Sequence, residues 1–196
     1  MTALDYDWEF LEDGKTIEPI SIGMVADDGR TYYAVNARLA SHGWKGWRLR
    51  RRIRKHKWLM ENVIPHLPKP SGDWNLHMPK SWLFNYHDPA VKPMQQIADE
   101  VQAFILGTDP DELPDVELWA NYGSYDHVCL AQMWGRMIDL PEGVPMFTND
   151  VQQEARRQGL SWKDLPKQES GEHNALADAR HNQVVRRWLA SRQETS

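Results

Sequence analysis

Alternating hydrophobic and polar positions near the start of the chain predict β-strands. Residues 6–11 form the first strand, in which aromatic and apolar side chains flank two acids, and residues 16–25 form the second, which is rich in isoleucine. The turn at 27–30 suits a hairpin because Gly29 tolerates a positive φ, and residues 31–35 then pair back as a third strand. The chain is therefore expected to open as an antiparallel meander.

In the rest of the chain, apolar residues recur mainly at the spacing of α-helices. One helical region is expected over 37–70 with a break at His42-Gly43, and Ser124 and Gly159 are placed to cap and close two later helices. The later elements are helices at 94–106, 125–137, 150–158 and 174–191, a strand at 116–120 and a loop at 109–114. The apolar side of the last helix is expected to hold Leu176, Ala177, Val184, Val185, Trp188 and Leu189.

Composition is that of a soluble globular protein. The chain has 196 residues and 22.8 kDa, no internal repeat and no second-domain boundary, so one domain over residues 1–196 is expected. Ten tryptophans are unusual, and because tryptophan is costly to expose, most are expected in the core or at an interface. A net charge of −5 argues against a protein dedicated to coating nucleic acid.

Cysteine content and hydropathy indicate the compartment. The single Cys129 excludes an internal disulfide and fits a reducing cytoplasm. No apolar run is long enough to span a bilayer, and the first five residues lack the basic-then-apolar signature of a signal peptide. We expect a cytoplasmic protein that does not associate with membranes.

One short segment, residues 44–58, interleaves basic with aromatic residues. Its cations are Lys45, Arg48, Arg50, Arg51, Arg52, Arg54, Lys55 and Lys57. Cations bind phosphates and aromatic rings stack on bases, so the segment is a candidate guide for a nucleic-acid substrate. It equally fits a solvated helix whose tryptophans are core residues, because Trp44, Trp47 and Trp58 follow a roughly helical spacing.

Three short acidic patches, far apart along the chain, carry the candidate chemistry. In the first, Asp7 and Glu9 are two residues apart on a strand, so both point to one face, while Trp8 points to the other and can pack in the core. Such a pair can hold one cation or bridge two, and hard cations such as Mg²⁺ and Mn²⁺ prefer oxygen ligands. The alternative is the polar, solvent-facing side of an edge strand.

The second and third patches lie at predicted helix starts. Asp126 falls in a first turn, where negative charge is favoured, so a structural role is the alternative. His173 is expected in the loop before the last helix and Asp178 on that helix. A loop histidine near a metal-held carboxylate suits a general base, and the alternative is an ordinary loop histidine. The four carboxylates and the histidine could together hold two divalent metal ions and activate water against a phosphodiester.

Other patterns do not support a site. Gly14-Lys15-Thr16 has the end of a phosphate-binding loop, but Glu9 stands where the first glycine is required. Cys129 and His127 lie in one helix without a nearby acid to complete a thiol hydrolase, and His181 is assigned a structural role.

The order and spacing of the patches resemble the DEDDh class of 3′–5′ exonucleases, which have a ribonuclease H-like fold. A closer resemblance, over nearly the whole chain, is to the actinobacterial ribonuclease AS family of polyadenylate-specific 3′-exoribonucleases. It is carried by residues 6–10, 20–23, 28–35, 117–120, 125–128 and 173–180. The chain departs from that family at Trp8, where a small polar residue is often found, and in the segment 44–58, which looks like a helical insertion. The resemblance implies an α/β fold with a mixed sheet, in which an antiparallel N-terminal meander and parallel strands are flanked by helices.

Carried over residue by residue, the resemblance implies a two-metal mechanism. Asp7 would bridge two Mg²⁺ or Mn²⁺ ions, Glu9 and Asp178 would complete the ion beside the attacking water, and Asp126 would hold the other through waters. His173 would take the proton from that water, and the product would be a nucleoside 5′-monophosphate. Expected substrate contacts are Phe10, Tyr125, Arg50, Arg51, Arg52 and Arg54.

The expected partner is single-stranded nucleic acid. RNA, including poly(A) tails or 3′ overhangs, is favoured by the resemblance. A single-stranded DNA 3′–5′ exonuclease is the alternative among enzymes, and a non-catalytic nucleic-acid-binding module is the alternative from another class. The resemblance also implies a homodimer, whose interface could bury some of the tryptophans.

Overall fold

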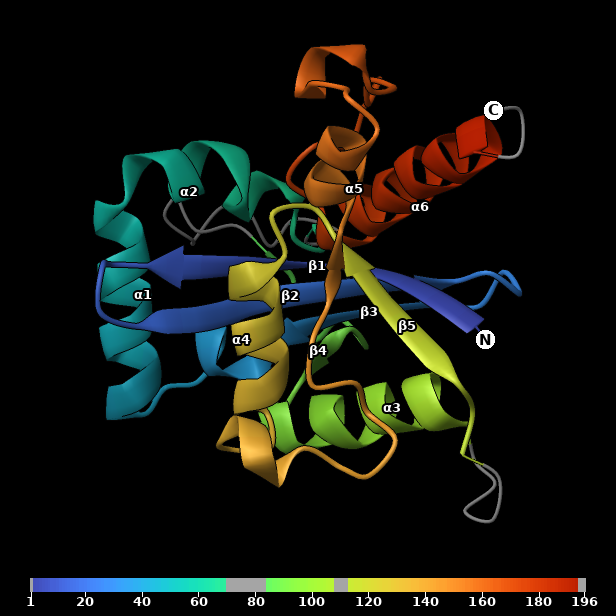
Figure 1. Cartoon of the computed structure of the whole chain (residues 1–196). Helices are drawn as coiled ribbons and strands as arrows, with labels where there is room; N and C mark the ends of the chain where they lie inside the picture. The colour runs from blue at the N-terminus through green and yellow to red at the C-terminus, as the bar shows by residue number, and fades with distance from the viewer. Residues whose placement is uncertain (1, 70–83, 108–112, 194–196) are drawn as a thin grey trace.

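A mixed six-stranded sheet is the centre of the protein (Figure 1). The computed structural model describes residues 2–69, 84–107 and 113–193. The strands are β1 (Thr2–Glu12), β2 (Ile17–Ala26), β3 (Thr31–Asn36), β4 (Val91–Lys92), β5 (Val116–Ala120) and β6 (Asn149–Asp150), in the order β4-β3-β2-β1-β5-β6. β1, β2 and β3 form the predicted antiparallel meander, whereas β4, β5 and β6 pair in parallel with their neighbours. This arrangement is consistent with the expected ribonuclease H-like fold.

Six α-helices flank the sheet within the described residues. They are α1 (Trp44–Lys55), α2 (Lys57–Asn62), α3 (Met94–Leu106), α4 (Ser124–Gln132), α5 (Val151–Arg157) and α6 (Ala175–Gln193). Short 3₁₀ turns are η1 (Ala37–Leu39), η2 (Ile64–His66), η4 (Met137–Asp139) and η5 (Trp162–Asp164). The predicted helix 94–106 and strand 116–120 are confirmed to the residue. In the described ranges, no helix combines the length and the apolar character needed to cross a membrane.

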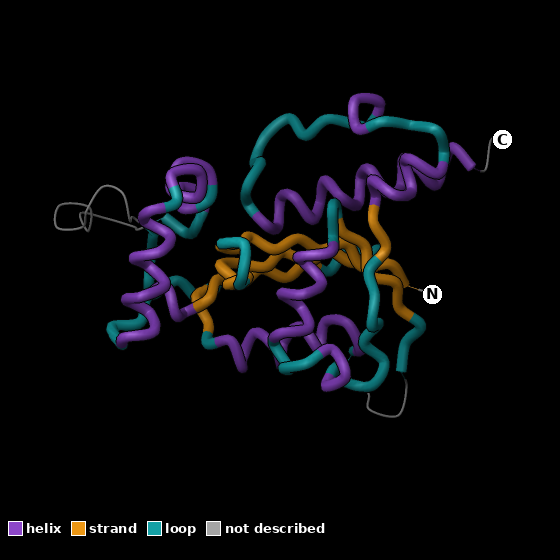
Figure 2. Tube along the Cα trace, turned by 60° about the vertical axis from the view of Figure 1, so that its left-hand side comes forward, coloured by secondary structure: helices purple, strands orange, loops and turns teal. Residues whose placement is uncertain are grey.

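The helices form layers on the two faces and at one end of the sheet. Figures 1 and 2 show α3 and α4 on one face, α5 and α6 on the other, and α1 and α2 beside the β1–β2 turn. Leu4, Tyr6 and Trp8 of β1 face α3 and α4 and form part of the main core. A separate core joins α1 and α2 to the end of the sheet through residues such as Leu49 and Ile53.

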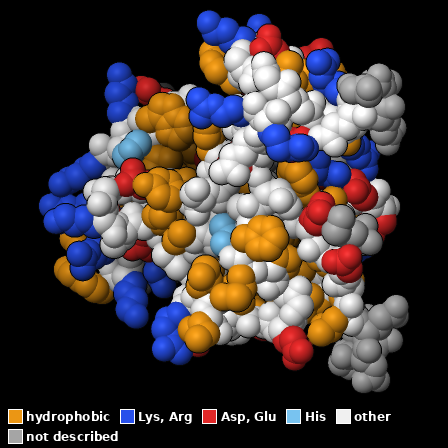
Figure 3. Space-filling view, viewed as in Figure 1, with side chains coloured by type: hydrophobic (Ala, Val, Ile, Leu, Met, Phe, Trp, Pro, Cys, Tyr) orange, Lys and Arg blue, Asp and Glu red, His pale blue; other side chains and the backbone are white. Residues whose placement is uncertain are grey.

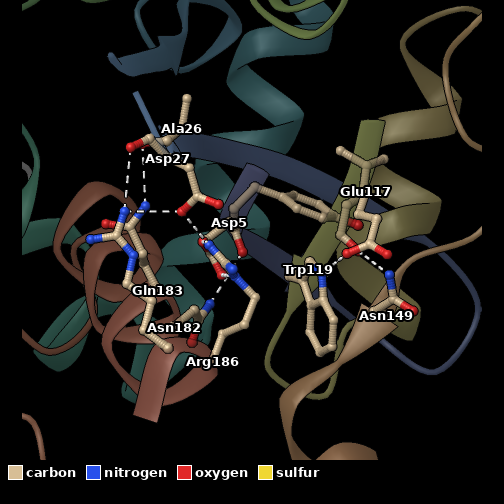
Figure 4. A network of polar contacts seen from close by, with 12 residues as sticks. Asp5, Ala26, Asp27, Glu117, Trp119, Asn149, Asn182, Gln183 and Arg186 are labelled. Carbon is tan, nitrogen blue, oxygen red and sulfur yellow. Dashed lines mark hydrogen bonds and ion pairs between the residues drawn. The ribbon is translucent and has the colours of Figure 1, made fainter. Parts of the chain in front are cut away.

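A buried ion-pair network fixes α6 on the sheet (Figure 4). The fully buried Asp5 of β1 accepts two hydrogen bonds from Nε of Arg186 and one from its Nη2, at 2.8–3.1 Å. The same guanidinium donates to Oδ1 of Asp27 at 2.6 Å. One turn earlier in the helix, Nδ2 of Asn182 donates to the backbone oxygen of Tyr6 at 3.2 Å. These contacts hold the middle of α6, and with it the first turn of the helix, in a fixed position over β1.

Two helix predictions are wrong in detail. α4 ends at Gln132, before the left-handed Gly135 (φ +116°), and its N-cap is Gly123 rather than Ser124, which already lies in the helix. In α6, Val184 is 54% exposed, because the buried side follows Ala175, Ala179, Asn182, Val185 and Leu189 instead. The predicted loop at 109–114 lies mostly outside the described residues.

The expectation that most tryptophans lie in the core or at an interface is confirmed in part for those that the structure describes. Trp8 is buried in the core, but Trp44 is 70% and Trp162 63% exposed. Trp134 packs against the main core, and Trp119 and Trp188 pack against a smaller cluster around α5 and α6. The exposed rings therefore need another explanation than core packing.

Candidate active site

A cavity of about 400 Å³ opens where β1, the start of α4 and the start of α6 meet. We call it the acid pocket. Its lining contains the five residues predicted for metal binding and catalysis and the two aromatic residues predicted to contact substrate: Asp7, Glu9, Asp126, His173, Asp178, Phe10 and Tyr125. The fold thus brings the three patches together from both ends and the middle of the chain.

Strand alternation orients the first two acids. Asp7 and Glu9 point into the acid pocket, whereas Trp8 points to the opposite face of β1 and packs in the main core. The predicted division of this strand is confirmed. Asp5 belongs to the same series of alternate positions, but Arg186 neutralises it, as described above.

Asp126 reaches the pocket from the first turn of α4. Its side chain is buried, and its Oδ1 accepts a hydrogen bond of 2.7 Å from the backbone N–H of Trp8. The N–H of Gly123, just before the helix, donates to Oδ2 of Asp150 at 2.8 Å. The Asp126 carboxylate is therefore held directly against β1, at the point where Asp7 and Glu9 project. The prediction that Asp126 lies in the first turn of a helix is confirmed.

Asp178 and His173 form one local unit at the start of α6. The backbone N–H of His173 donates to Oδ2 of Asp178 at 2.9 Å, and Nε2 of Gln168 donates to Oδ1 at 2.7 Å. His173 lies in the loop before the helix, as predicted, with a left-handed backbone (φ +66°). Both carboxylate oxygens are thereby oriented, and each keeps a further lone pair toward the pocket.

A close approach between β2 and α6 sets the position of Asp178. Gly23 of β2 is the register partner of Asp7. A Cβ atom on Gly23 would lie 2.3 Å from the carbonyl carbon and oxygen of Ala175 and from Cα of Leu176. Only glycine allows the first turn of α6 to lie this close to the strand.

Burial and mutual repulsion raise the pKa values of the pocket carboxyls. Desolvation, followed by the charges of the other three acids, raises the pKa of Asp7 well above its ordinary value. Desolvation with the charges of Asp178 and Asp126 raises the pKa of Glu9 to about 8. Desolvation also raises the pKa of Asp126, to about 7, and the pKa of Asp178. Four acids held together in this way disfavour their own ionised forms.

The donor set fits divalent cations. Within the described residues, no Lys or Arg side chain pairs with a pocket carboxylate, in contrast to the Asp5–Arg186 pair. Glu9, His173 and Asp178 each place one potential ligand atom within 4.8 Å of the others. Carboxylate oxygens are the ligands that Mg²⁺ and Mn²⁺ prefer, and a bound cation would favour the ionised carboxylates.

Aromatic side chains border the pocket on two sides. The rings of Phe10 and Tyr125 make an edge-to-face contact with centroids 6.0 Å apart. On the other side, the ring of Trp58 in α2 lies edge-to-face with the His173 imidazole at 4.8 Å. The contact of Trp58 with His173 joins two segments that the sequence analysis treated separately, and the role of Gln168 had no signal in the sequence.

Two arginines of the segment 44–58 are engaged within the protein. Arg52 donates to Glu18 at 2.8 Å and to Asp13 at 2.7 Å, and Nη1 of Arg50 donates to the backbone oxygens of Leu39 and Ser41. The Arg52 contacts join α1 to the β1–β2 region, and the Arg50 contacts join it to the η1 segment. Contact of either arginine with substrate stays a prediction. The alternative of tryptophans buried in the core is wrong, since Trp44, Trp47 and Trp58 are all exposed.

The sheet order and the converging acids define the class of the protein as a nuclease with a ribonuclease H-like sheet. The family model of the 3′–5′ exoribonuclease Rv2179c-like domain matches residues 2–189, and the chain belongs to this family.

Two curated relatives have the same degree of similarity. They are 3′–5′ exoribonuclease MT2234.1 of Mycobacterium tuberculosis (strain CDC 1551 / Oshkosh) and 3′–5′ exoribonuclease Rv2179c of Mycobacterium tuberculosis (strain ATCC 25618 / H37Rv). Each is 37% identical over 182 residues, which cover 89% of this chain and 85% of the relative. The chain is therefore an enzyme, a 3′–5′ exonuclease, and the alternative of a non-catalytic binding module is set aside.

Proposed function

We propose that the protein is a metal-dependent 3′–5′ exoribonuclease of the DEDDh class, which shortens single-stranded RNA and releases nucleoside 5′-monophosphates. The observation that carries the proposal is the convergence of Asp7, Glu9, Asp126 and Asp178 with His173 in one pocket, without basic partners among the described residues. The names of the family and of its relatives support RNA as the substrate.

The four carboxylates would hold two Mg²⁺ or Mn²⁺ ions. Asp7 would contribute to holding both ions, since it lies on the same strand as Glu9 and the charges of all three other acids raise its pKa. When bound, the ions would supply positive charge to the attacking and leaving oxygens of the phosphodiester. Asp126 is fixed by the Trp8 N–H, and Asp178 by Gln168 and the His173 N–H, so the carboxylates need little rearrangement.

His173 would act as the general base. Its ring lines the pocket and contacts Trp58 edge-to-face. One ring nitrogen lies within 4.8 Å of a carboxylate oxygen of Glu9 and one of Asp178. It would take the proton of the attacking water at a ring nitrogen while its backbone N–H keeps Asp178 in place. His181 also lines the pocket, but it is not part of the cluster with metal-ligand spacing among the described residues, and it has no role in the proposed chemistry.

Phe10 and Tyr125 would contact the terminal nucleotide. Their rings meet at the pocket mouth, and Tyr125 is half exposed, so an aromatic face is available to a base. Preference for RNA would require contacts to the 2′-hydroxyl. Comparison of matched RNA and DNA strands, including a poly(A) tract, tests this part. Faster cleavage of DNA would favour the DNA exonuclease alternative, and equal rates on all RNA sequences would argue against an adenine preference.

One incubation tests the proposal as a whole. A 5′-labelled single-stranded RNA is incubated with the protein and Mn²⁺, with Mn²⁺ and excess chelator, and with the Asp7→Asn variant. We expect a ladder that shortens one nucleotide at a time from the 3′ end, only with wild-type protein and metal. Shortening that survives the chelator, or internal cleavage products, would contradict the proposal.

We propose that the working form is a cytoplasmic homodimer. Large apolar side chains remain exposed on the segment that leads from η4 to β6, where Met137, Ile138, Met146 and Phe147 are each more than half exposed. Such side chains can be covered by a second copy. Light scattering at micromolar concentration should give twice 22.8 kDa, and a monomer mass would refute the dimer.

A further inference from the structure

α1 presents two opposite faces. Gly46, Leu49 and Ile53 are buried against the rest of the protein. The exposed face has helical spacing and carries both aromatic rings and cations, namely Trp44, Trp47, Arg48, Arg51 and Lys55, which also border a hollow of about 300 Å³. We call these five residues the aromatic-basic ledge. At about 1.5 Å per helical residue the ledge is roughly 16 Å long, enough to contact several nucleotides.

The side chains of the ledge are stacked on one another. The rings of Trp44 and Trp47 lie 24° from parallel with centroids 5.1 Å apart, and the Arg51 guanidinium carbon lies 5.3 Å from the Trp47 centroid. Trp44 is nevertheless 70% exposed. A stacked indole with a free face and an adjacent cation is the arrangement that binds a base and its phosphate.

α1, which carries the ledge, is fixed to the rest of the protein by ion pairs and close packing. Arg52 pairs with Asp13 and Glu18 of the β1–β2 turn region, on the sheet side of α1. Gly46 allows a close approach, since a Cβ there would lie 2.5 Å from the backbone oxygen of Ser41. The Arg52 ion pairs and this packing orient the exposed face without using its side chains, so little ordering is needed on binding.

Charge identifies a polyanion as the partner. The segment 44–58 contains eight Lys and Arg and no acid. Because the whole chain carries −5, the rest of it carries −13. Figure 3 shows these basic side chains gathered at the edge formed by α1, with apolar side chains among them. A second copy of the same face would be repelled, whereas RNA would be attracted here and repelled by most of the remaining surface.

The ledge leads to the acid pocket. After Lys55, the chain turns at His56 into α2, whose Trp58 contacts the His173 ring. Nδ2 of Asn174 also donates to the backbone oxygen of His66, so the α2–η2 segment and the loop of the general base are joined. An exonuclease that removes the 3′ nucleotide in the pocket must hold the rest of the strand on its 5′ side, and the ledge is continuous along the chain with the α2–η2 segment that contacts the pocket loop.

We propose that the aromatic-basic ledge is a second binding site for single-stranded RNA, 5′ to the nucleotide being removed. Trp44 and Trp47 stack on bases, and Arg48, Arg51 and Lys55 bind phosphates. The inference rests on the proposed function for the identity of the strand. It predicts that the enzyme distinguishes long from short substrates by binding, while the cleavage step depends on the acid pocket alone.

The test compares Trp44→Ala/Trp47→Ala and Arg48→Ser/Arg51→Ser with wild type. Binding of a 20-nucleotide fluorescent RNA is measured by anisotropy in chelator, where no cleavage occurs, at two salt concentrations. Hydrolysis of a dinucleotide is measured with Mn²⁺. Trp44→Phe/Trp47→Phe keeps the stacking faces, and Arg156→Ser on α5 removes one exposed cation far from the ledge in sequence, so both serve as controls.

We expect the double alanine variant to bind the 20-mer at least about 5-fold more weakly, because stacking contributes roughly 1–3 kcal/mol per base and 1.4 kcal/mol corresponds to a factor of ten. The double serine variant should lower the slope of binding against salt by roughly 1.4, at about 0.7 per phosphate contact. Dinucleotide turnover and both controls should stay near wild type.

Three results would overturn the proposal that the ledge binds RNA: unchanged 20-mer binding, an equal loss on both substrate lengths, or a shift to monomers without loss of RNA binding. If wild type with Mn²⁺ does not shorten the 20-mer from its 3′ end, the proposed function fails independently of the ledge.

Discussion

The acid pocket and the aromatic-basic ledge use charged side chains in opposite ways. In the pocket, four acids are gathered by alternation along β1 and by the first turns of α4 and α6, and their burial raises the pKa values of the carboxyls. On the ledge, cations stand exposed on one face of a helix whose other face is packed. The pocket therefore holds like charges together at an energetic cost that a metal would remove, whereas the ledge leaves its charges in water, ready for a long polyanion.

The contrast separates chemistry from binding. Residues of the pocket must keep their relative positions, and the backbone contacts of Gly23, Trp8 and His173 provide this. Residues of the ledge need only exposed faces and an anchored helix. Variants in the pocket should consequently lower turnover on every substrate, and variants on the ledge should act only on long ones.

The largest effect is expected from loss of a pocket carboxylate. Asp7→Asn or Asp178→Asn should lower turnover by about 10³-fold or more, because metal ions contribute several kcal/mol to stabilising the charge of the transition state. The metal-free variants should be as stable as wild type or slightly more stable, since mutual repulsion of the acids is relieved. Near-normal turnover of either variant would refute the metal-site assignment, and long RNA should still bind the ledge.

His173→Ala should act mainly on turnover. Loss of a general base costs about 10²–10⁴-fold, and part of the activity should return at higher pH, where hydroxide is more available. Mn²⁺ affinity, measured by calorimetry, should change much less than turnover. A variant as active as wild type at neutral pH would exclude His173 as the base.

Gly23→Ala tests whether backbone packing positions the chemistry. The new methyl group would force the first turn of α6 away from β2, and a displacement of about 1 Å can cost roughly 10²-fold in rate. Gly43→Ala is the matched control, because its Cβ would meet only Oγ of Ser41, at an ordinary 3.5 Å. If both variants keep wild-type turnover, the close approach does not control the site.

Trp58→Ala tests the junction between the two regions. An edge-to-face aromatic contact contributes about 0.5–1.5 kcal/mol, so removing the ring from His173 should lower turnover roughly 2- to 10-fold even on a dinucleotide. Trp58→Phe should recover most of it. A loss confined to long RNA would assign Trp58 to the ledge rather than to positioning of the base.

The smallest expected effect is on stability. The pKa of Glu9 is raised to about 8 in the folded protein, from an ordinary value of 4.5. The folded state thus keeps a proton that the unfolded state releases, and the free energy of unfolding of the metal-free protein should fall as pH rises from 4.5 to 8. Denaturant unfolding at pH 5 and 8 measures this decline, which Glu9→Gln or saturating Mg²⁺ should reduce. A decline that Glu9→Gln leaves unchanged would show that other groups cause it.

Local sequence patterns predicted the parts of the molecule that local geometry controls. Alternation along β1 placed Asp7 and Glu9 on one face and Trp8 in the core, and the first turns of two helices placed Asp126 and Asp178. The aromatic spacing of α1 did not reveal which face is buried, because Leu49 and Ile53 form a competing stripe on the same helix.

Other features depend on contacts between distant segments. The pairing of Asp5 with Arg186, the hydrogen bond from Gln168 to Asp178, and the approach of α6 to Gly23 have no signature in the sequence near either partner. They follow from the position of α6 over the sheet. The periodicity and spacing of residues in a single sequence do not specify that position.

The central claim is that the four pocket carboxylates hold two divalent ions for cleavage. Its most direct measurement is the number of Mn²⁺ ions bound per chain, by titration in the presence of a nucleoside 5′-monophosphate, for wild type and Asp7→Asn. We predict two ions for wild type and the loss of at least one, with weakened binding of any that remains, for the variant. No bound Mn²⁺ in wild type, or equal binding by both proteins, would contradict the account.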